Sequence, residues 1–234
     1  MEKNSVLRVS EKFFSIQGEG QTVGVPAIFL RLGGCNLLCK SRDWVCDSIA
    51  VWRNSTKIPF DEVLSEVDVK NLRDGAHLVI TGGEPLLHQE SVVWFLNWFI
   101  GKYDFKPIVE IETNGTIIPN YYLDGFVTYW NVSPKLINSG ESTERRINNV
   151  ALSWFNTNKK TGWKFVISHE LDVKEIREDF SFIPFNSKMS FMPAGDSLES
   201  IAENQKLVVD LCKKCKVKFC PRLQITIYNQ ATGV

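Results

Sequence analysis

The sequence of 234 residues has no excess of charge, few histidines and no long hydrophobic run. Its 27 Lys and Arg residues are matched by 27 Asp and Glu residues, so the composition does not imply a nucleic-acid-binding surface. No apolar stretch approaches the roughly 18 residues that a membrane span needs, so we expect no membrane contact. The first residues lack the apolar core of a signal peptide, and we therefore expect a cytoplasmic protein.

The cysteines are more informative than the overall composition. Without a secretory signal, six cysteines indicate metal or core roles rather than disulfides. Cys35, Cys39 and Cys46 share one loop with the spacing C-x3-C-x6-C, and soft thiolates favour zinc or an iron–sulfur cluster. A zinc site of three Cys and one His lacks its histidine, since all three histidines lie outside the loop. We therefore favour a cubane cluster, in which three thiolates leave one iron open for chemistry.

The other three cysteines admit two interpretations. Cys212 and Cys215 have the spacing of half a second metal site. They also continue an apolar stripe that begins at 207–211 with helical spacing, and a free cysteine packs like a small hydrophobic residue. We favour core packing for this pair and for Cys220. His88 shows no evident partner and is expected at the surface or behind the site.

Strand-like and helix-like segments alternate along the chain. This alternation predicts a parallel sheet with helical crossovers in a single domain over 1–234. A full eight-unit barrel typically takes roughly 250 residues, so a barrel of this length would be compact and incomplete. The expected strands are 6–16, 26–32, 77–80, 108–111, 126–132, 163–167 and 188–192, with a last extended segment at 217–228. The expected helices are 59–72, 89–103, 144–155, 170–179 and one that starts with a capping box of Asp196 and Glu199 and runs to about 214.

Polar residues recur where the expected strands end. In parallel α/β folds the carboxyl ends of the strands form the active-site face. We therefore expect one rim to carry Gln17, Cys35, Thr81, Glu112, Ser133 and Met192.

Each polar motif has a functional and a simpler interpretation. The Gly-Gly-Glu run at 82–84 could grip the amino group of a small zwitterion, or could be an ordinary turn. Ser133 and Lys135 could bind a carboxylate or a ribose, or could flank a solvated turn at Pro134. In the same way, polarity at 112–114 is common in loops.

Three residues near the first two strands could recognise a substrate. Gln17 and Glu19 offer an amide and a carboxylate, which match the paired donors and acceptors of a heterocycle. Arg31 lies four residues before Cys35, where it could bind a substrate carboxylate or form a structural salt bridge.

Together these motifs resemble a known superfamily. The cysteine loop with Asp47 and Ser48, the Thr-Gly-Gly-Glu-Pro run at 81–85 and the Ser-Pro-Lys run at 133–135 resemble the radical S-adenosylmethionine enzymes. The runs at 14–20 and 29–32 are similar to one branch, the 7-carboxy-7-deazaguanine synthases. The similarity spans nearly the whole chain.

The resemblance implies a compact, incomplete (βα)6-type barrel that acts as a homodimer. It implies a [4Fe–4S] cluster whose open iron binds S-adenosylmethionine, and an electron donor such as flavodoxin or ferredoxin. The cleaved cofactor gives a 5′-deoxyadenosyl radical, which abstracts hydrogen from 6-carboxy-5,6,7,8-tetrahydropterin. The ring then contracts to 7-carboxy-7-deazaguanine with loss of ammonia, assisted by Mg²⁺.

Site residues follow from the resemblance position by position. The cluster ligands would be Cys35, Cys39 and Cys46, and Ser48 would offer its hydroxyl to Mg²⁺. The S-adenosylmethionine site would be lined by Val45, Asp47, Gly83, Glu84, Ser133, Pro134, Lys135 and Met192. The pterin would be held by Ile16, Gln17, Gly18, Glu19, Arg31 and Thr81, with the tail closing over it at Val234.

Three features depart from the family pattern. The last cysteine gap is six residues where the superfamily usually has two, so 41–44 would have to bulge outward. Ser48 stands where many members have Thr. Gln224 falls near a substrate-contacting His of some members, and we assign it no role.

Two alternative functions stay open. A radical-activating enzyme, which places a glycyl radical on a partner protein, would share the cysteine loop but needs an open surface. The set of Gln17, Glu19 and Arg31 argues instead for a small anionic heterocycle. A non-catalytic zinc-binding module is the third hypothesis.

Overall fold

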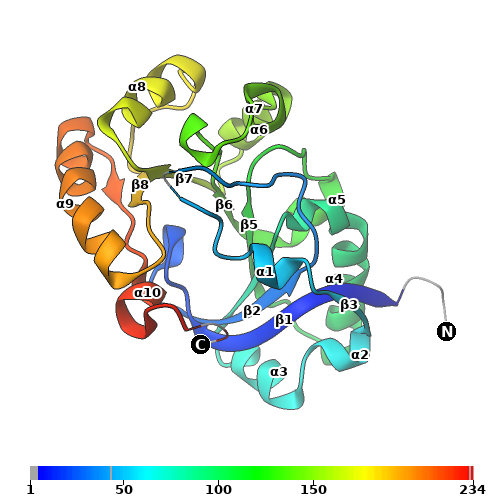
Figure 1. Ribbon diagram of the computed structural model, residues 1–234. Helices are drawn as coiled ribbons and strands as arrows, with labels where there is room; N and C mark the ends of the chain where they lie inside the picture. The colour runs from blue at the N-terminus through cyan, green and yellow to red at the C-terminus, as the bar shows by residue number, and fades with distance from the viewer. Residues whose placement is uncertain (1–4, 43, 232, 234) are drawn as a thin grey trace.

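The computed structural model describes residues 5–42, 44–231 and 233, and one curved sheet forms its centre (Figure 1). Among these residues the sheet has nine strands in the order β3-β1-β2-β4-β5-β6-β7-β8-β9. Strands β2 and β4 to β9 are parallel, whereas β1 runs antiparallel to β2 and to β3. The strands are β1 (Val6–Ile16), β2 (Pro26–Leu32), β3 (Thr56–Pro59), β4 (His77–Gly82), β5 (Ile108–Thr113), β6 (Val127–Val132), β7 (Thr161–Ile167), β8 (Met189–Pro193) and β9 (Lys218–Phe219).

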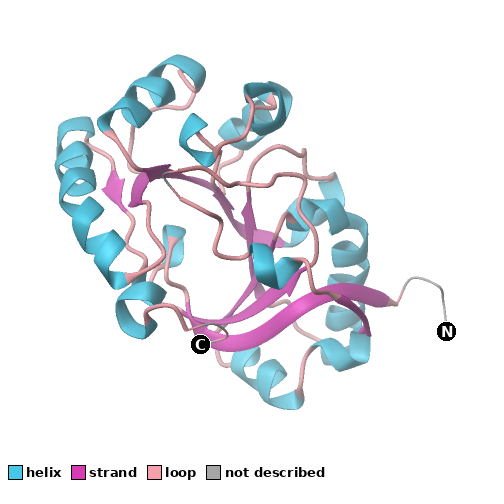
Figure 2. Ribbon diagram, viewed as in Figure 1, coloured by secondary structure: helices cyan, strands magenta, loops and turns pink. Residues whose placement is uncertain are grey.

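Most of the helices lie around the outside of this sheet, whereas α1 (Ile49–Trp52) lies across its front in the view of Figure 2. The other helices are α2 (Phe60–Val63), α3 (Glu66–Arg73), α4 (Gln89–Tyr103), α5 (Tyr121–Phe126), α6 (Thr143–Arg146), α7 (Asn149–Thr157), α8 (Glu170–Asp179), α9 (Leu198–Cys215) and α10 (Leu223–Tyr228). Three short 3₁₀ turns accompany them: η1 (Gly20–Thr22), η2 (Pro85–His88) and η3 (Ile137–Ser139). The predicted α/β class, with parallel strands in an incomplete barrel, is confirmed.

Alternation along the strands separates an apolar outer face from a polar inner one. In β4, Leu78 and Ile80 belong to the main core, which also contains Phe95 and Phe99 of α4. The intervening Val79 belongs instead to a small cluster with residues of β2 on the inner face. Because successive side chains of a strand point to opposite faces, the remaining inward positions are free to carry polar groups. The outer face thus supplies stability, and the inner face can supply chemistry.

Two predicted helices are each broken into two. The segment 59–72 is interrupted at Leu64, whose backbone is extended (φ −121°, ψ 133°). Ser65 then starts α3 with a capping box that it shares with Asp68. In the same way, Ile147 (φ −114°, ψ 114°) separates α6 from α7. A cap residue inside an apolar pattern offers the backbone an alternative to a continuous helix.

Other boundaries also differ from the prediction. The N-cap of α9 is Ser197, paired with Ser200, and not Asp196 paired with Glu199. The segment 217–228, predicted to be extended, forms only the short β9 before turning into α10. The edge strand β3 and the helix α5 were not predicted, because both are short and lack a clear hydrophobic period.

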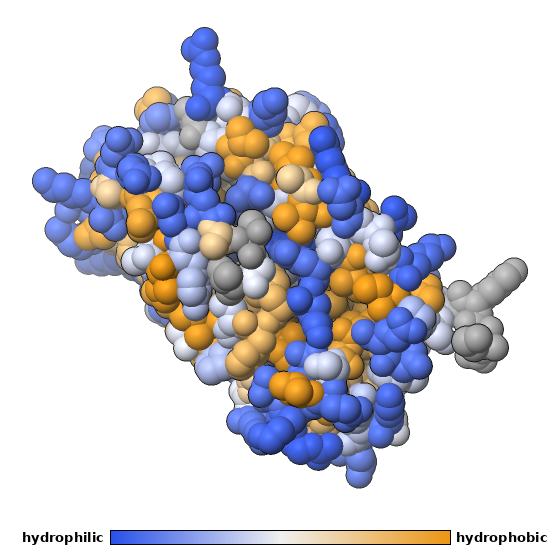
Figure 3. Space-filling view, turned by 60° about the horizontal axis from the view of Figure 1, so that its bottom comes forward, coloured by the Kyte–Doolittle hydropathy of each residue, from blue (hydrophilic) through white to orange (hydrophobic). Residues whose placement is uncertain are grey.

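The surface does not carry a continuous hydrophobic belt on the face drawn in Figure 3, where hydrophobic patches are separated by hydrophilic side chains. Of the helices in the described part of the chain, none is long and apolar enough to cross a membrane.

Candidate active site

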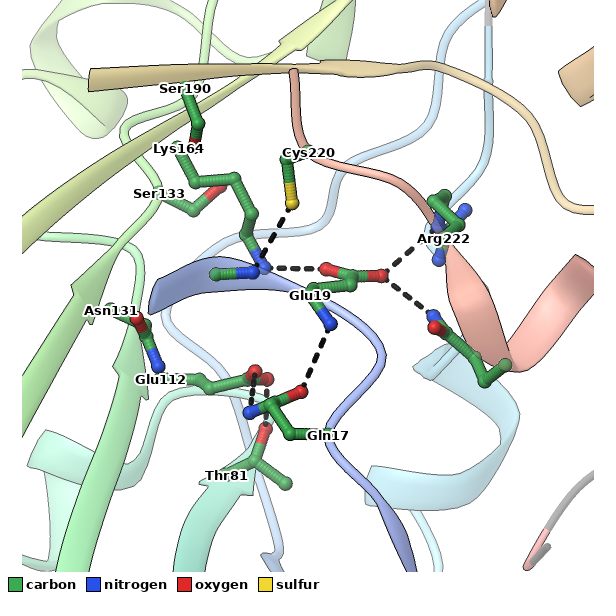
Figure 4. A network of polar contacts seen from close by, with 12 residues as sticks. Gln17, Glu19, Thr81, Glu112, Asn131, Ser133, Lys164, Ser190, Cys220 and Arg222 are labelled. Carbon is green, nitrogen blue, oxygen red and sulfur yellow. Dashed lines mark hydrogen bonds and ion pairs between the residues drawn. The ribbon is translucent and has the colours of Figure 1, made fainter. Parts of the chain in front are cut away.

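A cluster of polar side chains fills the inner face of the curved sheet (Figure 4). Thr81 of β4, Glu112 of β5 and Lys164 of β7 point inward from the strands. Gln17 and Glu19 enter from the loop after β1. Because β1 runs antiparallel to β2, this loop comes from the end at which the parallel strands begin. The prediction that Gln17 shares the carboxyl rim with the other motifs is therefore wrong, although its side chain still reaches the same interior.

Glu112 joins two of the predicted substrate residues. Gln17 Nε2 donates to Glu112 Oε1 at 3.2 Å, and Thr81 Oγ1 donates to Glu112 Oε2 at 3.2 Å. Gln17 and Thr81 are buried, with exposed fractions of 1% and 5%. Buried polar groups are retained only when they are hydrogen-bonded, so these contacts fix the orientation of both side chains.

Glu19 is held by two cations. Its Oε2 lies 2.5 Å from Lys164 Nζ, and its Oε1 lies 3.0 Å from Arg222 Nε. Gln224 Nε2 donates to the same Oε1 at 2.7 Å. Burial works against ionisation of Glu19, but Lys164 and Arg222 outweigh it and hold the pKa of this carboxyl well below its usual range. Glu19 is therefore a fixed anion.

Of the two interpretations of Arg31, the structure shows the salt bridge within the protein. Its Nε donates to Glu11 Oε1 at 2.7 Å, and its Nη1 donates to Ser48 Oγ at 3.1 Å. Ser48 Oγ in turn donates to Asp47 Oδ1 at 2.8 Å. Arg31 is thus a salt-bridged residue next to the cysteine loop, and its function in binding an anion stays a prediction.

The cysteine loop forms a short hairpin. Lys40 and Val45 make an antiparallel bridge, and Cys46 N donates to Cys39 O at 3.1 Å. The backbones of Cys39 and Cys46 are therefore adjacent despite the long gap between them in the sequence, and the outward bulge of 41–44 stays a prediction.

A neighbouring segment anchors this hairpin. Ser41 Oγ donates to the Asn138 carbonyl at 2.6 Å, and Trp44 Nε1 donates to Asn138 Oδ1 at 3.2 Å. The amide of Leu38 donates to Glu141. These contacts join the described residues of the loop to the segment 138–141.

The three loop cysteines are free thiols in a partly buried environment. Burial raises the pKa of Cys35 to about 11, and nearby Glu84 and Cys39 act in the same direction. Burial also raises the pKa of Cys39 and of Cys46, while Lys135 opposes the shift at all three. Each thiol is thus protonated in the metal-free chain, and metal binding would release protons.

The chemical type of the donors fits an iron–sulfur cluster, but the present placement of their side chains does not. Three soft sulfur donors share one loop, and the amide of Leu37 donates to Cys35 Sγ at 3.4 Å, a contact that stabilises a cluster thiolate. Within the described residues, however, no three Cys, His, Asp or Glu side chains are placed to hold a metal ion. The residues fit the cluster by type, and their role as ligands stays a prediction.

The end of β4 packs directly against the cysteine loop. A Cβ built on Gly83 would lie 2.2 Å from Gly34 O and 2.6 Å from Cys35 Cβ, so only glycine fits. Glu84 is fully buried and accepts hydrogen bonds from Leu86 N, Thr113 Oγ1 and Asn114 N at 2.8 to 3.0 Å. Burial raises the pKa of Glu84. In this structure its carboxylate thus organises the loops around it.

Of the remaining residues predicted to contact the cofactor, Ser133 and Met192 lie at or near the carboxyl ends of their strands. Ser133 follows β6, and Lys135 Nζ donates to Ser133 Oγ at 3.2 Å. Met192 is a buried residue of β8, whereas Val45 is 46% exposed. Val234, predicted to close over the substrate, lies outside the described residues.

Four other residues have clear positions. Cys212 and Cys215 are buried in the main core, as predicted. His88 is not unpartnered: its Nε2 lies 2.6 Å from Gly33 O, next to the cysteine loop. The prediction of core packing is wrong for Cys220: it is buried, but beside the polar cluster and outside the main core, and its Sγ accepts from Gly20 N at 3.2 Å.

Sequence reasoning missed Lys164, Asn131 and Arg222. Lys164 had a usable signal, since a lysine inside a buried strand must find an anion. Asn131 Nδ2 donates to Glu110 Oε2 at 2.9 Å, deeper in the same interior. Arg222 had no signal, because its segment was expected to be extended.

Comparison with known proteins supports one family. A model described as a 4Fe-4S single cluster domain matches residues 16–120. The fold is similar to the crystal structure of QueE from Escherichia coli, with a TM-score of 0.64 and 21% identity, covering 92% of this chain and 93% of that one.

Two curated relatives cover almost the full length. The 7-carboxy-7-deazaguanine synthase of Halobacterium salinarum is 30% identical over 96% of this chain and 91% of its own. That of Pyrobaculum aerophilum is 32% identical, with 97% of each chain covered. On these matches, the chain belongs to the 7-carboxy-7-deazaguanine synthase family.

Proposed function

We propose that this protein is a radical S-adenosylmethionine lyase that converts 6-carboxy-5,6,7,8-tetrahydropterin to 7-carboxy-7-deazaguanine with loss of ammonia. The full-length match to synthases of that name is the observation that carries the proposal. The inward-facing set of Gln17, Glu19 and Thr81 supports it, because amide, carboxylate and hydroxyl groups suit a small polar heterocycle better than a protein substrate.

In this proposal the chain positions the reactants. Gln17, Glu19 and Thr81 orient the pterin ring, and Arg31 pairs with its carboxylate after exchanging one of its present partners, Glu11 or Ser48. Ile16 and Gly18 shape the same wall. Burial of these groups excludes water and strengthens each hydrogen bond.

The cofactor site adjoins this set. Cys35, Cys39 and Cys46 would hold the [4Fe–4S] cluster, which when bound supplies the electron that cleaves S-adenosylmethionine. The S-adenosylmethionine would contact the cysteine loop and the strand ends at Val45, Asp47, Gly83, Glu84, Ser133, Pro134, Lys135 and Met192. Because Glu84 is already hydrogen-bonded three times, we expect the backbone of Gly83 to contribute at least as much as that carboxylate.

A magnesium site at Ser48 does not fit the structure as it stands. A hydroxyl and the Asp47 carboxylate are oxygen donors of the kind that Mg²⁺ prefers. However, Arg31 donates to Ser48 and Arg222 donates to Asp47, so two guanidinium groups occupy the surroundings of the site. Magnesium could bind only after these groups had moved.

The proposal also includes the expected setting of the enzyme. We expect a single catalytic domain, a homodimer and a cytoplasmic location, with flavodoxin or ferredoxin as the electron donor. The homodimer can be checked by the sedimentation of the purified protein.

Turnover of the pterin tests the proposal directly. Anaerobically reconstituted protein should form the deazapurine from carboxytetrahydropterin, S-adenosylmethionine and a reductant. Arg31→Ala should abolish this turnover but spare uncoupled cleavage of S-adenosylmethionine. Arg8→Ala, which removes an exposed arginine that contacts Ser55, is the control. Absence of the deazapurine from wild-type protein that cleaves S-adenosylmethionine would refute the proposal and would revive the radical-activase alternative.

A further inference from the structure

Arg222 connects three segments that are far apart in the chain. Its Nε lies 3.0 Å from Glu19 Oε1 in the loop after β1, and its Nη2 lies 2.5 Å from Asp47 Oδ2, next to Cys46. Its Nη1 donates to the carbonyl of Gly195, in the loop after β8. The Arg222 side chain is only 13% exposed. One planar guanidinium group therefore binds two carboxylates and a carbonyl in a largely buried position.

These contacts are part of a continuous chain of polar groups. From Asp47 the chain continues through Ser48 Oγ, at 2.8 Å, to Arg31 Nη1, at 3.1 Å. Glu19 and Arg31, the two charged residues expected to hold the substrate, are thus linked through the segment that follows Cys46. Figure 4 shows Arg222 at the Glu19 end of this chain.

The helix α10, which begins directly after Arg222, is itself docked on the loop after β1. Leu223 N donates to Gly18 O at 3.1 Å. A Cβ on Gly18 would lie 3.0 Å from the backbone N of Gln224 and would collide with its side chain, so the glycine favours this close approach of α10. Arg222 is therefore held by its side-chain contacts and by the docking of the helix that follows it. We expect a displacement of Glu19 to shift Arg222 and, through it, Asp47.

We infer that Arg222 is a positioning residue that ties the loop of Glu19 to the segment after Cys46. Occupation of the pterin site would then change the surroundings of the cysteine loop. The tie is a property of the metal-free chain, and only its consequence for turnover rests on the proposed function.

Hydrogen exchange on the metal-free protein tests the tie. Arg222→Gln should speed exchange roughly tenfold, or about 1.4 kcal/mol, in a peptide covering 46–52, where the amides of Cys46, Val51 and Trp52 are hydrogen-bonded. Exchange in 17–25 should rise too, whereas β5 and β6 should be unaffected. Lys160→Gln, which breaks an ion pair with Asp124 outside this polar chain, should leave both peptides unchanged.

A second substitution distinguishes the tie from general loosening. Asp47→Asn should speed exchange in 46–52 by itself, and adding it to Arg222→Gln should cause little further change, because both cut the same link. Arg222→Lys retains the charge but can reach one carboxylate at a time, so it should protect only one of the two peptides. Unchanged exchange in 46–52 in folded Arg222→Gln, or additive effects of the two substitutions, would overturn the inference.

The reconstituted protein tests the consequence. The carboxytetrahydropterin should alter the electron paramagnetic resonance spectrum of the reduced cluster in wild type and not in Arg222→Gln. Its binding is measured separately by equilibrium dialysis. A pterin that binds wild type without altering the spectrum would contradict the coupling. A pterin that fails to bind would contradict the proposed function, while the exchange data would still decide the tie.

Discussion

The backbone N–H of Cys46 donates to the carbonyl of Cys39 at 3.1 Å, so these two cysteines are paired across a hairpin. The next pair outward, Lys40 and Val45, closes the turn. A gap of six residues therefore separates Cys39 and Cys46 in sequence without separating them in space. The hairpin thus keeps the backbones of two of the three expected ligands adjacent, although no three side chains of the described residues are placed to hold a metal ion.

Deleting residues 41–44, which restores the spacing C-x3-C-x2-C, should preserve cluster binding. The deletion removes the tip of the hairpin and leaves the backbone of both cysteines in place. It should destabilise the protein by about 1–3 kcal/mol, because Asn138 loses its hydrogen bonds to Ser41 and Trp44. Iron and sulfide per chain and urea unfolding are the measurements. A folded deletion variant without iron would mean that the insertion itself builds the site.

Replacing Glu19 and replacing Lys164 should lower the free energy of unfolding by different amounts. Glu19→Gln leaves Lys164 without its ion-pair partner and removes one of the two carboxylates that pair with Arg222. We therefore expect the free energy of unfolding to fall by about 3 kcal/mol. Lys164→Met leaves Glu19 paired with Arg222 and Gln224, and we expect about 1 kcal/mol. Urea unfolding of the metal-free variants compares them. Equal losses, or a larger loss for Lys164→Met, would show that Lys164 rather than Glu19 is the centre of the charge cluster.

Asp124 should make stability depend on pH in the acid range. Burial opposes its ionisation, but hydrogen bonds from Trp130, Asn158 and Lys160 outweigh burial and lower its pKa in the folded protein. The folded state therefore binds this proton less readily than the unfolded state. The stabilisation is complete above the ordinary Asp pKa of about 3.9 and is lost as the pH falls through the folded-state pKa.

Asp124→Asn measures this contribution. The variant should be about 1 kcal/mol less stable than wild type near neutral pH, and the difference should shrink between about pH 5 and pH 3. Urea unfolding across this range is the measurement, with the exposed Glu62→Gln as the control. A difference that stays constant with pH would contradict the assignment.

Long, regular elements could be predicted from the sequence. The bounds of β1, β2, α4 and α8 agree with the expectation, because each carries a hydrophobic period or, in β2, a continuous apolar run over most of its length. Short elements could not, since α10 and β3 depend on tertiary contacts such as the docking of Leu223 on Gly18. Propensity is a weak guide where packing decides.

The site was only partly predictable for the same reason. Gln17, Thr81 and Glu112 could be chosen as polar groups that end strands. The hydrogen bond from Gln17 to Glu112, however, depends on a loop that enters from the opposite end of the sheet. Arg222 is 203 residues from Glu19, and no local pattern brings them together. Both contacts arise because β1 runs antiparallel to β2 and so brings its following loop, with Gln17 and Glu19, into the interior from the other end.

The most direct test of the account is the metal content of the reconstituted protein. Wild-type protein and Cys46→Ala should be reconstituted anaerobically with iron and sulfide, and their iron, sulfide, zinc and visible spectra measured. We predict about four irons per chain with a broad visible absorption in wild type, lost in Cys46→Ala. Zinc at about one per chain without sulfide, or a cluster indifferent to Cys46, would contradict the three-cysteine site and with it the proposed radical chemistry.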